Sequence, residues 1–155
     1  MDKVSIIVRT CGRPEVLRGA LESIRKQTYP DVETVVIEDG LEISRQMICT
    51  EYSDLQLRYI STGKRVGRAK AGNLGMKVAQ GKYLNFLDDD DVLYPEHIEI
   101  LLQTLQSAEE KAVYSVAEEA AAIYRKRKRT FYDVRKKVRF REPFNRMYLL
   151  HTNYL

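Results

Sequence analysis

The chain of 155 residues contains only two cysteines and no long apolar run. Cys11 and Cys49 have neither the paired spacing of a metal-ligand set nor the pattern of a disulfide framework, so zinc modules and disulfide-rich domains are excluded. Free thiols are typical of a reducing compartment. The apolar-leaning run 4–8 is too short for a signal peptide or a membrane span. A cytoplasmic protein is therefore expected.

Stretches rich in glycine, serine or proline are also missing, as are internal repeats. A linker between domains is thus not indicated. The composition is 44% hydrophobic and 31% charged, which is ordinary for a globular protein in water. At this length one hydrophobic core is the simplest expectation.

Short apolar, β-branched runs alternate with stretches of helical spacing along most of the chain. This alternation predicts an α/β fold, in which helices cover both faces of a mostly parallel sheet. Such sheets bind ligands at the carboxyl ends of their strands. The predicted strands are 4–8, 32–39, 56–61, 82–87 and 112–116, and the predicted helices are 14–27, 41–52, 68–79 and one that begins near 95.

Four consecutive aspartates, Asp88 to Asp91, directly follow the predicted strand 82–87. Two carboxylates about 4 Å apart repel each other by roughly 4 kcal/mol at an effective dielectric constant near 20. Such a run needs either full solvation or a cation, and oxygen ligands of this kind suit Mg²⁺ or Mn²⁺. A solvated acidic loop is the alternative.

Two further features are predicted to lie at the same edge of the sheet. Asp39 ends the strand 32–39, where its carboxylate could accept hydrogen bonds from a base or a ribose, or could serve only in an Asp-Gly turn. Segment 63–70 (GKRVGRAK) combines glycines, four cations and a helix start, which favours phosphate oxygens. It lacks the spacing of a Walker loop, and an ordinary basic loop is its alternative.

Four segments, in this order, resemble glycosyltransferase family 2, an inverting family with the GT-A fold. They are VSIIVRTCGRPEVLRGALESIRKQTYPDVETVVIEDG (4–40), GRAKAGNLGMKVAQGKYLNFL (67–87), DDDDVLYPEHIEIL (88–101) and AVYS (112–115). The resemblance implies a three-layer, Rossmann-like α/β/α core over residues 1–118. It also implies a nucleoside-diphosphate sugar, most simply a UDP-sugar, that lies across the strand ends.

The same resemblance assigns roles to particular residues. Asp39 would hold the nucleobase, and Arg9 and Thr10 would line the nucleotide pocket. The D-x-D motif maps onto Asp88 and Asp90, with both as metal-binding residues for Mn²⁺ or Mg²⁺. The ribose would be held by Asp88 or its neighbour Asp89.

One position departs from the family pattern. Where the family has an Ala-Arg-Asn triplet, this chain has AGN at 71–73. The role of the missing arginine is predicted to pass to Arg68 or Lys70.

The acceptor-binding half of the family follows the D-x-D region, and residues 119–155 resemble only its beginning. No general base is therefore assigned; the available acids Glu118, Glu119 and Asp133 are interpreted as surface groups. The segment 125–141 carries a net charge of +9, which leaves −5 for the rest of a chain whose total is +4. A two-stranded basic ribbon or a mobile arm is predicted over residues 121–141, which alternate partly.

Such a basic segment would suit an anionic acceptor, the diphosphate of a lipid-linked saccharide or an anionic membrane surface, or it is a solvated charged face. Peripheral contact with the inner membrane face through 125–141 is one expectation, and a nucleic-acid partner is not expected. A homo-oligomer is left open.

The sequence predicts a metal-dependent inverting glycosyltransferase that transfers sugar from a nucleotide donor to the hydroxyl of a saccharide or lipid-linked acceptor, in polysaccharide or cell-surface glycan synthesis. Two alternatives are a catalytically incomplete nucleotide-sugar-binding module and a sugar-1-phosphate nucleotidyltransferase. RTCGRP after the first strand, in place of a glycine-rich phosphate loop, disfavours the second.

Overall fold

A computed structural model describes residues 1–107, 109, 111–125 and 130–140. From residue 121 onward it describes the backbone alone. The chain separates into two compact units, Met1–Ile100 and Leu101–Leu155. The predicted boundary between residues 118 and 119 stays a prediction.

The first unit is built on a four-stranded parallel sheet with the strand order β3-β2-β1-β4. Its α/β alternation confirms the predicted fold class. The elements are β1 (Val4–Thr10), α1 (Pro14–Arg25), β2 (Val32–Glu38), α2 (Arg45–Glu51), β3 (Leu57–Ser61), α3 (Arg68–Val78) and β4 (Tyr83–Asp88). They follow the predicted strands and helices closely, except that α2 is shorter than the predicted helix 41–52.

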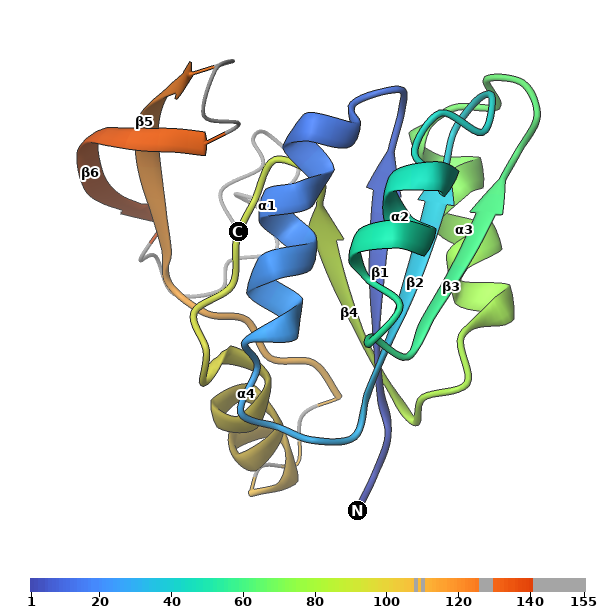
Figure 1. Ribbon diagram of the computed structural model, residues 1–155. Helices are drawn as coiled ribbons and strands as arrows, with labels where there is room; N and C mark the ends of the chain where they lie inside the picture. The colour runs from blue at the N-terminus through green and yellow to red at the C-terminus, as the bar shows by residue number, and fades with distance from the viewer. Residues whose placement is uncertain (108, 110, 126–129, 141–155) are drawn as a thin grey trace. The chain divides into compact units, whose positions relative to one another are not determined.

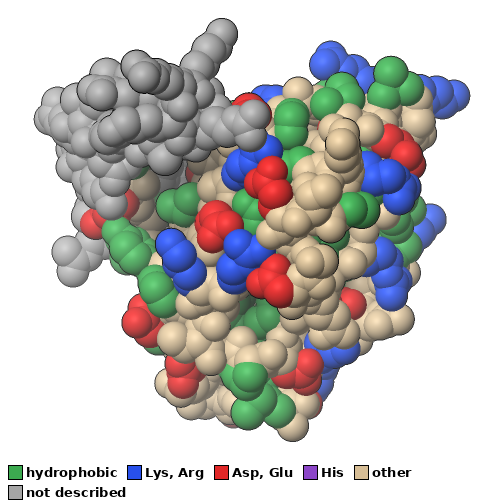
Figure 2. All heavy atoms as spheres, in the orientation of Figure 1, with side chains coloured by type: hydrophobic (Ala, Val, Ile, Leu, Met, Phe, Trp, Pro, Cys, Tyr) green, Lys and Arg blue, Asp and Glu red, His purple; other side chains and the backbone are tan. Residues whose placement is uncertain are grey.

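Helices cover both faces of this sheet, with α1 and α2 in front of it and α3 behind it in Figure 1. The face of α1 and α2 carries acidic and basic side chains close together (Figure 2). Arg18 on α1 forms an ion pair with Glu51 on α2 at 2.8 Å. The central strands β1 and β2 are almost fully buried, because side chains on both of their faces meet a helix.

The helix α3 packs closely against the sheet at Gly75. A Cβ atom at this position would lie 2.5 Å from Cγ2 of Ile7 and 3.4 Å from Cγ1 of Ile37, so the glycine allows the approach. Ile7 and Ile37 belong to the buried cluster on this face, together with Val35 and Ala71. The start of α3 is thereby held near the carboxyl ends of β1 and β2.

A buried carboxylate holds the opposite, amino-terminal end of the sheet. Glu33, which is 4% exposed, accepts hydrogen bonds from the Ser5 hydroxyl and from the backbone amides of Gln80 and Gly81. These contacts join β1 and β2 to the turn before β4. Burial of Glu33 opposes its ionisation, but the three hydrogen bonds prevail and lower the pKa of its carboxyl group.

In the second unit, β5 (Ala117–Arg125) and β6 (Thr130–Phe140) form an antiparallel ribbon. This confirms the predicted two-stranded ribbon; the side chains of its residues from 121 onward lie outside the described part of the structure. The predicted strand 112–116 is wrong, since these residues are irregular and the strand begins at Ala117, which pairs with Phe140. A strand needs a partner, and the pairing with β6 ends there.

The helix α4 (His97–Gln106) begins two residues after the predicted start at Pro95. Among the residues that the structure describes, neither this helix nor any other is long and apolar enough for a transmembrane segment.

Candidate functional site

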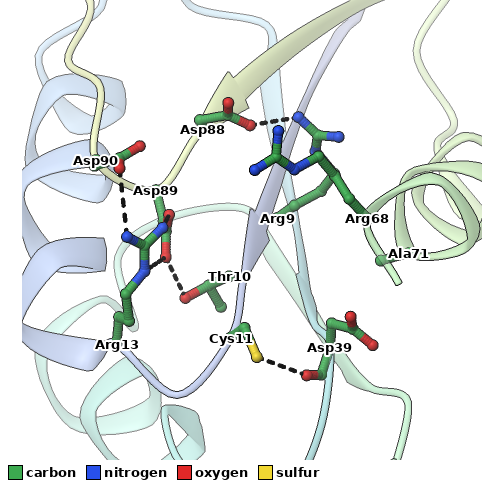
Figure 3. Close-up of a pocket in the computed structure, with 10 residues that line it drawn as sticks. All are labelled: Arg9, Thr10, Cys11, Arg13, Asp39, Arg68, Ala71, Asp88, Asp89 and Asp90. Carbon is green, nitrogen blue, oxygen red and sulfur yellow. Dashed lines mark hydrogen bonds and ion pairs between the residues drawn. The ribbon is translucent and has the colours of Figure 1, made fainter. Parts of the chain in front are cut away.

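A pocket of about 340 Å³ opens at the carboxyl-end edge of the parallel sheet. It lies where the strand ends align, because Thr10 is the register partner of Glu38 and Arg9 that of Asp88. Figure 3 shows the residues that line it: Arg9, Thr10, Cys11, Arg13, Asp39, Arg68, Ala71, Asp88, Asp89 and Asp90. Every residue predicted to bind the nucleotide or the metal is in this set except Lys70.

The four aspartates form a turn and do not point in one direction. The amide of Asp91 donates a hydrogen bond of 3.1 Å to the carbonyl oxygen of Asp88 and closes the turn. Carboxylate oxygens of Asp88, Asp90 and Asp91 all lie within 4.8 Å of one another. Asp89 is not a member of this group.

The three grouped carboxylates fit a divalent cation. They supply hard oxygen ligands at half-exposed or exposed positions, and Mg²⁺ and Mn²⁺ take such ligands together with substrate phosphates. Burial and the charges of the other three aspartates raise the pKa of Asp91, so the group carries unfavourable negative charge when it is alone. Asp88 and Asp90 are the predicted metal-binding residues, and the structure adds Asp91 to their group.

Asp89 turns into the protein and is 1% exposed. The Thr10 hydroxyl donates a hydrogen bond of 2.7 Å to Oδ2 of Asp89. Arg13 donates to both carboxylate oxygens, from Nε to Oδ2 at 3.1 Å and from Nη2 to Oδ1. The Arg13 side chain also reaches Oδ2 of the exposed Asp90 at 3.4 Å. Its partial burial opposes the charge, but the hydrogen bonds and charges of both aspartates raise the pKa of Arg13.

Arg9 pairs with Asp88 across the adjacent ends of β1 and β4. Its guanidinium carbon is 5.9 Å from the centre of the Phe86 ring, and its stem passes Gly72 on α3. A Cβ atom at Gly72 would lie 3.5 Å from Cδ of Arg9. Gly72 is the position at which the family's arginine is missing, and Arg9 places a cation beside it.

Asp39 directly follows β2, and its carboxylate holds the loop before α3. Oδ1 accepts a hydrogen bond of 2.6 Å from the amide of Val66, and Oδ2 accepts one of 3.0 Å from the amide of Gly67. Gly67 has φ +95°, a conformation that favours glycine. Arg68, the first residue of α3, is thus brought to the pocket wall, whereas Lys70 is exposed and does not line the pocket.

A second buried acid, Glu38, orders the loops that follow β1 and β2. It is fully buried and accepts hydrogen bonds from the amides of Gly12 at 3.1 Å and Ser44 at 2.9 Å, and from the Tyr59 hydroxyl. These contacts join β3 to both loops, so they set the position of residues 10–13 at the pocket.

Arg13 lines the pocket although the sequence did not predict it there, whereas Cys11 follows the predicted strand at the edge where ligands are expected to bind. Arg13 precedes Pro14 and reads as the start of a helix, while its partner Asp89 lies 76 residues further along the chain. Cys11 had no binding role predicted; it lines the pocket, and its Sγ donates a hydrogen bond of 3.0 Å to the carbonyl oxygen of Asp39. Their nearness to the predicted strand end was the available signal.

Taken together, the sheet, the strand-end pocket and the acidic turn define an α/β protein of the GT-A class. The family model "Glycosyl transferase family 2" matches residues 5–154, and the chain belongs to this family.

Curated relatives are glycosyltransferases. The chain is 30% identical to the glycosyltransferase GlyG of Streptococcus pneumoniae over 114 residues, which is 72% of this chain and 38% of the relative. It is 40% identical to an uncharacterized glycosyltransferase of Rickettsia felis over 107 residues, which is 67% of this chain and 17% of the relative. The chain thus spans less than two fifths of the length of these two relatives.

Solved structures share the fold. Staphylococcus aureus TarS matches with a TM-score of 0.62 and 26% identity, over 68% of this chain and 20% of that one. A mannosyltransferase from Pyrobaculum calidifontis, solved with GDP-Man and Mn²⁺, matches with a TM-score of 0.60 and 22% identity, over 83% of this chain and 37% of that one. The second likeness shows the fold alone.

Proposed function

We propose that this chain is the donor-binding part of an inverting, metal-dependent glycosyltransferase. The observation that carries the proposal is the group of Asp88, Asp90 and Asp91 oxygens, within 4.8 Å of one another, in the same strand-end pocket as the cations of Arg9 and Arg68. A nucleoside-diphosphate sugar with its metal ion suits a pocket that contains both acidic and basic side chains. Its diphosphate needs cations, and its base and ribose need hydrogen-bond partners.

The donor would lie across the ends of β1, β2 and β4. Asp39 would bind the base, because Oδ2 of its carboxylate keeps a lone pair beyond its bond to the amide of Gly67. Thr10 would line the ribose side, and Arg9 and Arg68 would face the diphosphate. Lys70, outside the pocket wall, could reach the donor only through a movement of its long side chain.

Asp88 and Asp90 would hold the Mn²⁺ or Mg²⁺ ion, with Asp91 beside them. When bound, the ion would neutralise the charge that develops on the departing diphosphate. Asp88 would also lie next to the ribose. Support for a metal comes from the fit of the three carboxylates and from the related fold that was solved with GDP-Man and Mn²⁺.

Transfer with inversion needs an acceptor hydroxyl held in line with the anomeric carbon and a base that removes its proton. We place neither group among the described residues, and relatives such as GlyG are more than twice as long as the region they share with this chain. A UDP-sugar is the favoured donor, and a saccharide or lipid-linked saccharide is the favoured acceptor, in polysaccharide or cell-surface glycan synthesis. The basic ribbon β5–β6 would meet an anionic acceptor or membrane surface.

The second candidate function is nucleotide-sugar binding without turnover, completed by another domain or chain. This chain matches only 38% and 17% of the length of two relatives, and this favours binding without turnover for this chain alone. Release of sugar or UDP from a UDP-sugar by the isolated chain would exclude it.

Thermal unfolding with a panel of nucleoside diphosphates, each with and without Mn²⁺, tests the donor site. A ligand of the folded state stabilises it by about 2.7 kcal/mol at a hundredfold excess over its dissociation constant. We expect UDP to raise Tm only with Mn²⁺, and Asp90→Asn to abolish this shift. Asp54→Asn is the matched control, since Asp54 is an exposed surface acid paired with Arg25 at 2.7 Å. The donor site is refuted if no nucleotide stabilises the chain or if Asp90→Asn keeps the shift.

A further inference from the structure

The four aspartates divide into two chemical environments although they are identical in sequence. Asp89 is 1% exposed, whereas the side chains of Asp88 and Asp90 are 42% and 56% exposed. Both oxygens of Asp89 already have donors, from Thr10 and from the bidentate guanidinium of Arg13. A carboxylate in this environment has little surface left for a metal or a ribose.

We propose that Asp89 is an anchor and not a ligand, and that Arg13 is the positioning residue of the metal site. This inference rests on the proposed donor and metal function. Arg13, at the start of α1, grips Asp89 and so fixes the turn that the amide of Asp91 closes. With Asp89 held on the inner side, Asp88, Asp90 and Asp91 are presented together on the outer side (Figure 3 shows Asp88, Asp89 and Asp90). The expected role of Asp89 in ribose binding is replaced by this one.

The bond between Arg13 and Asp89 has the geometry of a strong interaction. A bidentate pair of a guanidinium and a carboxylate fixes orientation as well as distance, which a single ammonium group does not. Thr10 adds a third donor from the end of β1 at 2.7 Å. The turn after β4 is thereby joined to both ends of the loop between β1 and α1, whose own position is set by the bond from Gly12 to Glu38.

Variants of Arg13 and Asp89 separate positioning from ligation. Arg13→Lys keeps a positive charge near Asp90 but loses the bidentate bond, and Asp89→Asn loses the charge of the anchor. Asp90→Asn is the contrasting variant, because it removes one exposed carboxylate from a cluster of carboxylates that repel one another. For each full-length variant we would measure Tm without metal and the affinity for Mn²⁺ in the presence of UDP, the latter from the electron paramagnetic resonance signal of free Mn²⁺.

Positioning by Arg13 predicts a specific pattern. Asp89→Asn and Arg13→Lys each lower the metal-free Tm and weaken Mn²⁺ binding by roughly tenfold, as loss of a supporting partner does at other metal sites. The double variant is no worse than the single variants, since both break one contact. Asp90→Asn abolishes Mn²⁺ binding and leaves the metal-free Tm unchanged or higher.

Three results would overturn the inference. If Asp89→Asn abolishes Mn²⁺ binding without lowering the metal-free Tm, Asp89 is a ligand. If Asp89→Asn and Arg13→Lys lower Tm but leave the affinity for Mn²⁺ unchanged, the contact serves stability alone. If the wild-type chain binds neither Mn²⁺ nor UDP, the donor function itself fails and the positioning role falls with it.

Discussion

Arg9 and Asp88 are register partners on adjacent parallel strands, and their side chains form an ion pair at the mouth of the pocket. One is a cation suited to a diphosphate and the other an acid suited to a metal. Within this pair the two charges offset each other. Binding of donor and metal would replace this ion pair with two new contacts, one between Arg9 and the diphosphate and one between Asp88 and the metal ion.

The substitution Arg9→Gln is therefore expected to change two affinities in opposite directions. Without its partner, Asp88 binds Mn²⁺ alone roughly two- to fivefold more tightly, which matches the modest strength of a partly exposed ion pair. UDP with Mn²⁺ binds about tenfold more weakly, because a charged hydrogen-bond donor is lost. Calorimetric titration with Mn²⁺, and then with UDP at saturating Mn²⁺, measures both.

Arg45→Gln provides the control for Arg9→Gln, since Arg45 pairs with Glu42 at 2.7 Å on the surface and does not line the pocket. Neither affinity should change in this variant. Equal losses of Mn²⁺ and UDP binding in Arg9→Gln would contradict the exchange of partners.

A second prediction concerns the base. Asp39→Asn keeps the shape of the side chain but presents an NH₂ group to one of the loop amides, so the contact with the base and one loop bond are lost. We expect affinity for UDP to fall about tenfold while affinity for inorganic diphosphate with Mn²⁺ changes little. Competition titrations with both ligands measure the ratio. Parallel losses for UDP and diphosphate would show that Asp39 acts only by holding the loop before Arg68.

Much of the fold was predictable because buried parallel strands have a strong sequence signature. The β-branched runs in β1 and β2, and the glycine shortly after each of them, indicated the elements and the edge at which the site lies. The irregular segment 112–116 was mistaken for a strand since an apolar run does not reveal whether a partner exists. The ribbon β5–β6 was predictable from its partial alternation.

The arrangement within the site was less predictable than its location. Four identical aspartates give no sign of which one faces inward; the turn closed by Asp91 and the reach of Arg13 decide it. Contacts between long side chains distant in sequence, such as Arg13 with Asp89, leave no periodic pattern. Glu38 lies at a predicted strand end, but its role depends on loops that only the fold brings together.

A third prediction tests the close packing of α3 on the sheet. Gly75→Ala would place a Cβ atom 2.5 Å from Cγ2 of Ile7, a buried and conformationally restricted side chain, and we expect a loss of about 1–3 kcal/mol in unfolding free energy. Gly72→Ala is the matched control on the same helix. Its Cβ atom would meet only ordinary contacts at 3.5 and 3.7 Å, so stability should be unchanged or rise by up to about 1 kcal/mol. Urea denaturation gives both values, and equal effects would contradict the close approach of α3 to Ile7.

The last prediction concerns acid stability and the buried Glu33. Its carboxyl group has a pKa below the ordinary value of 4.5, because hydrogen bonds from Ser5, Gln80 and Gly81 outweigh its burial. The ionised form thus stabilises the fold above about pH 4.5, and this contribution is lost as pH falls through the lower pKa of the folded state. Glu33→Gln should cost about 1–3 kcal/mol at pH 7, since a neutral amide is a weaker acceptor for buried donors. The difference from wild type should shrink toward pH 3, and Ser5→Ala should show a smaller effect of the same sign. Denaturant titrations at pH 7, 4.5 and 3 measure it; a difference that stays constant or grows toward acid would exclude the ionised carboxylate as the stabilising species.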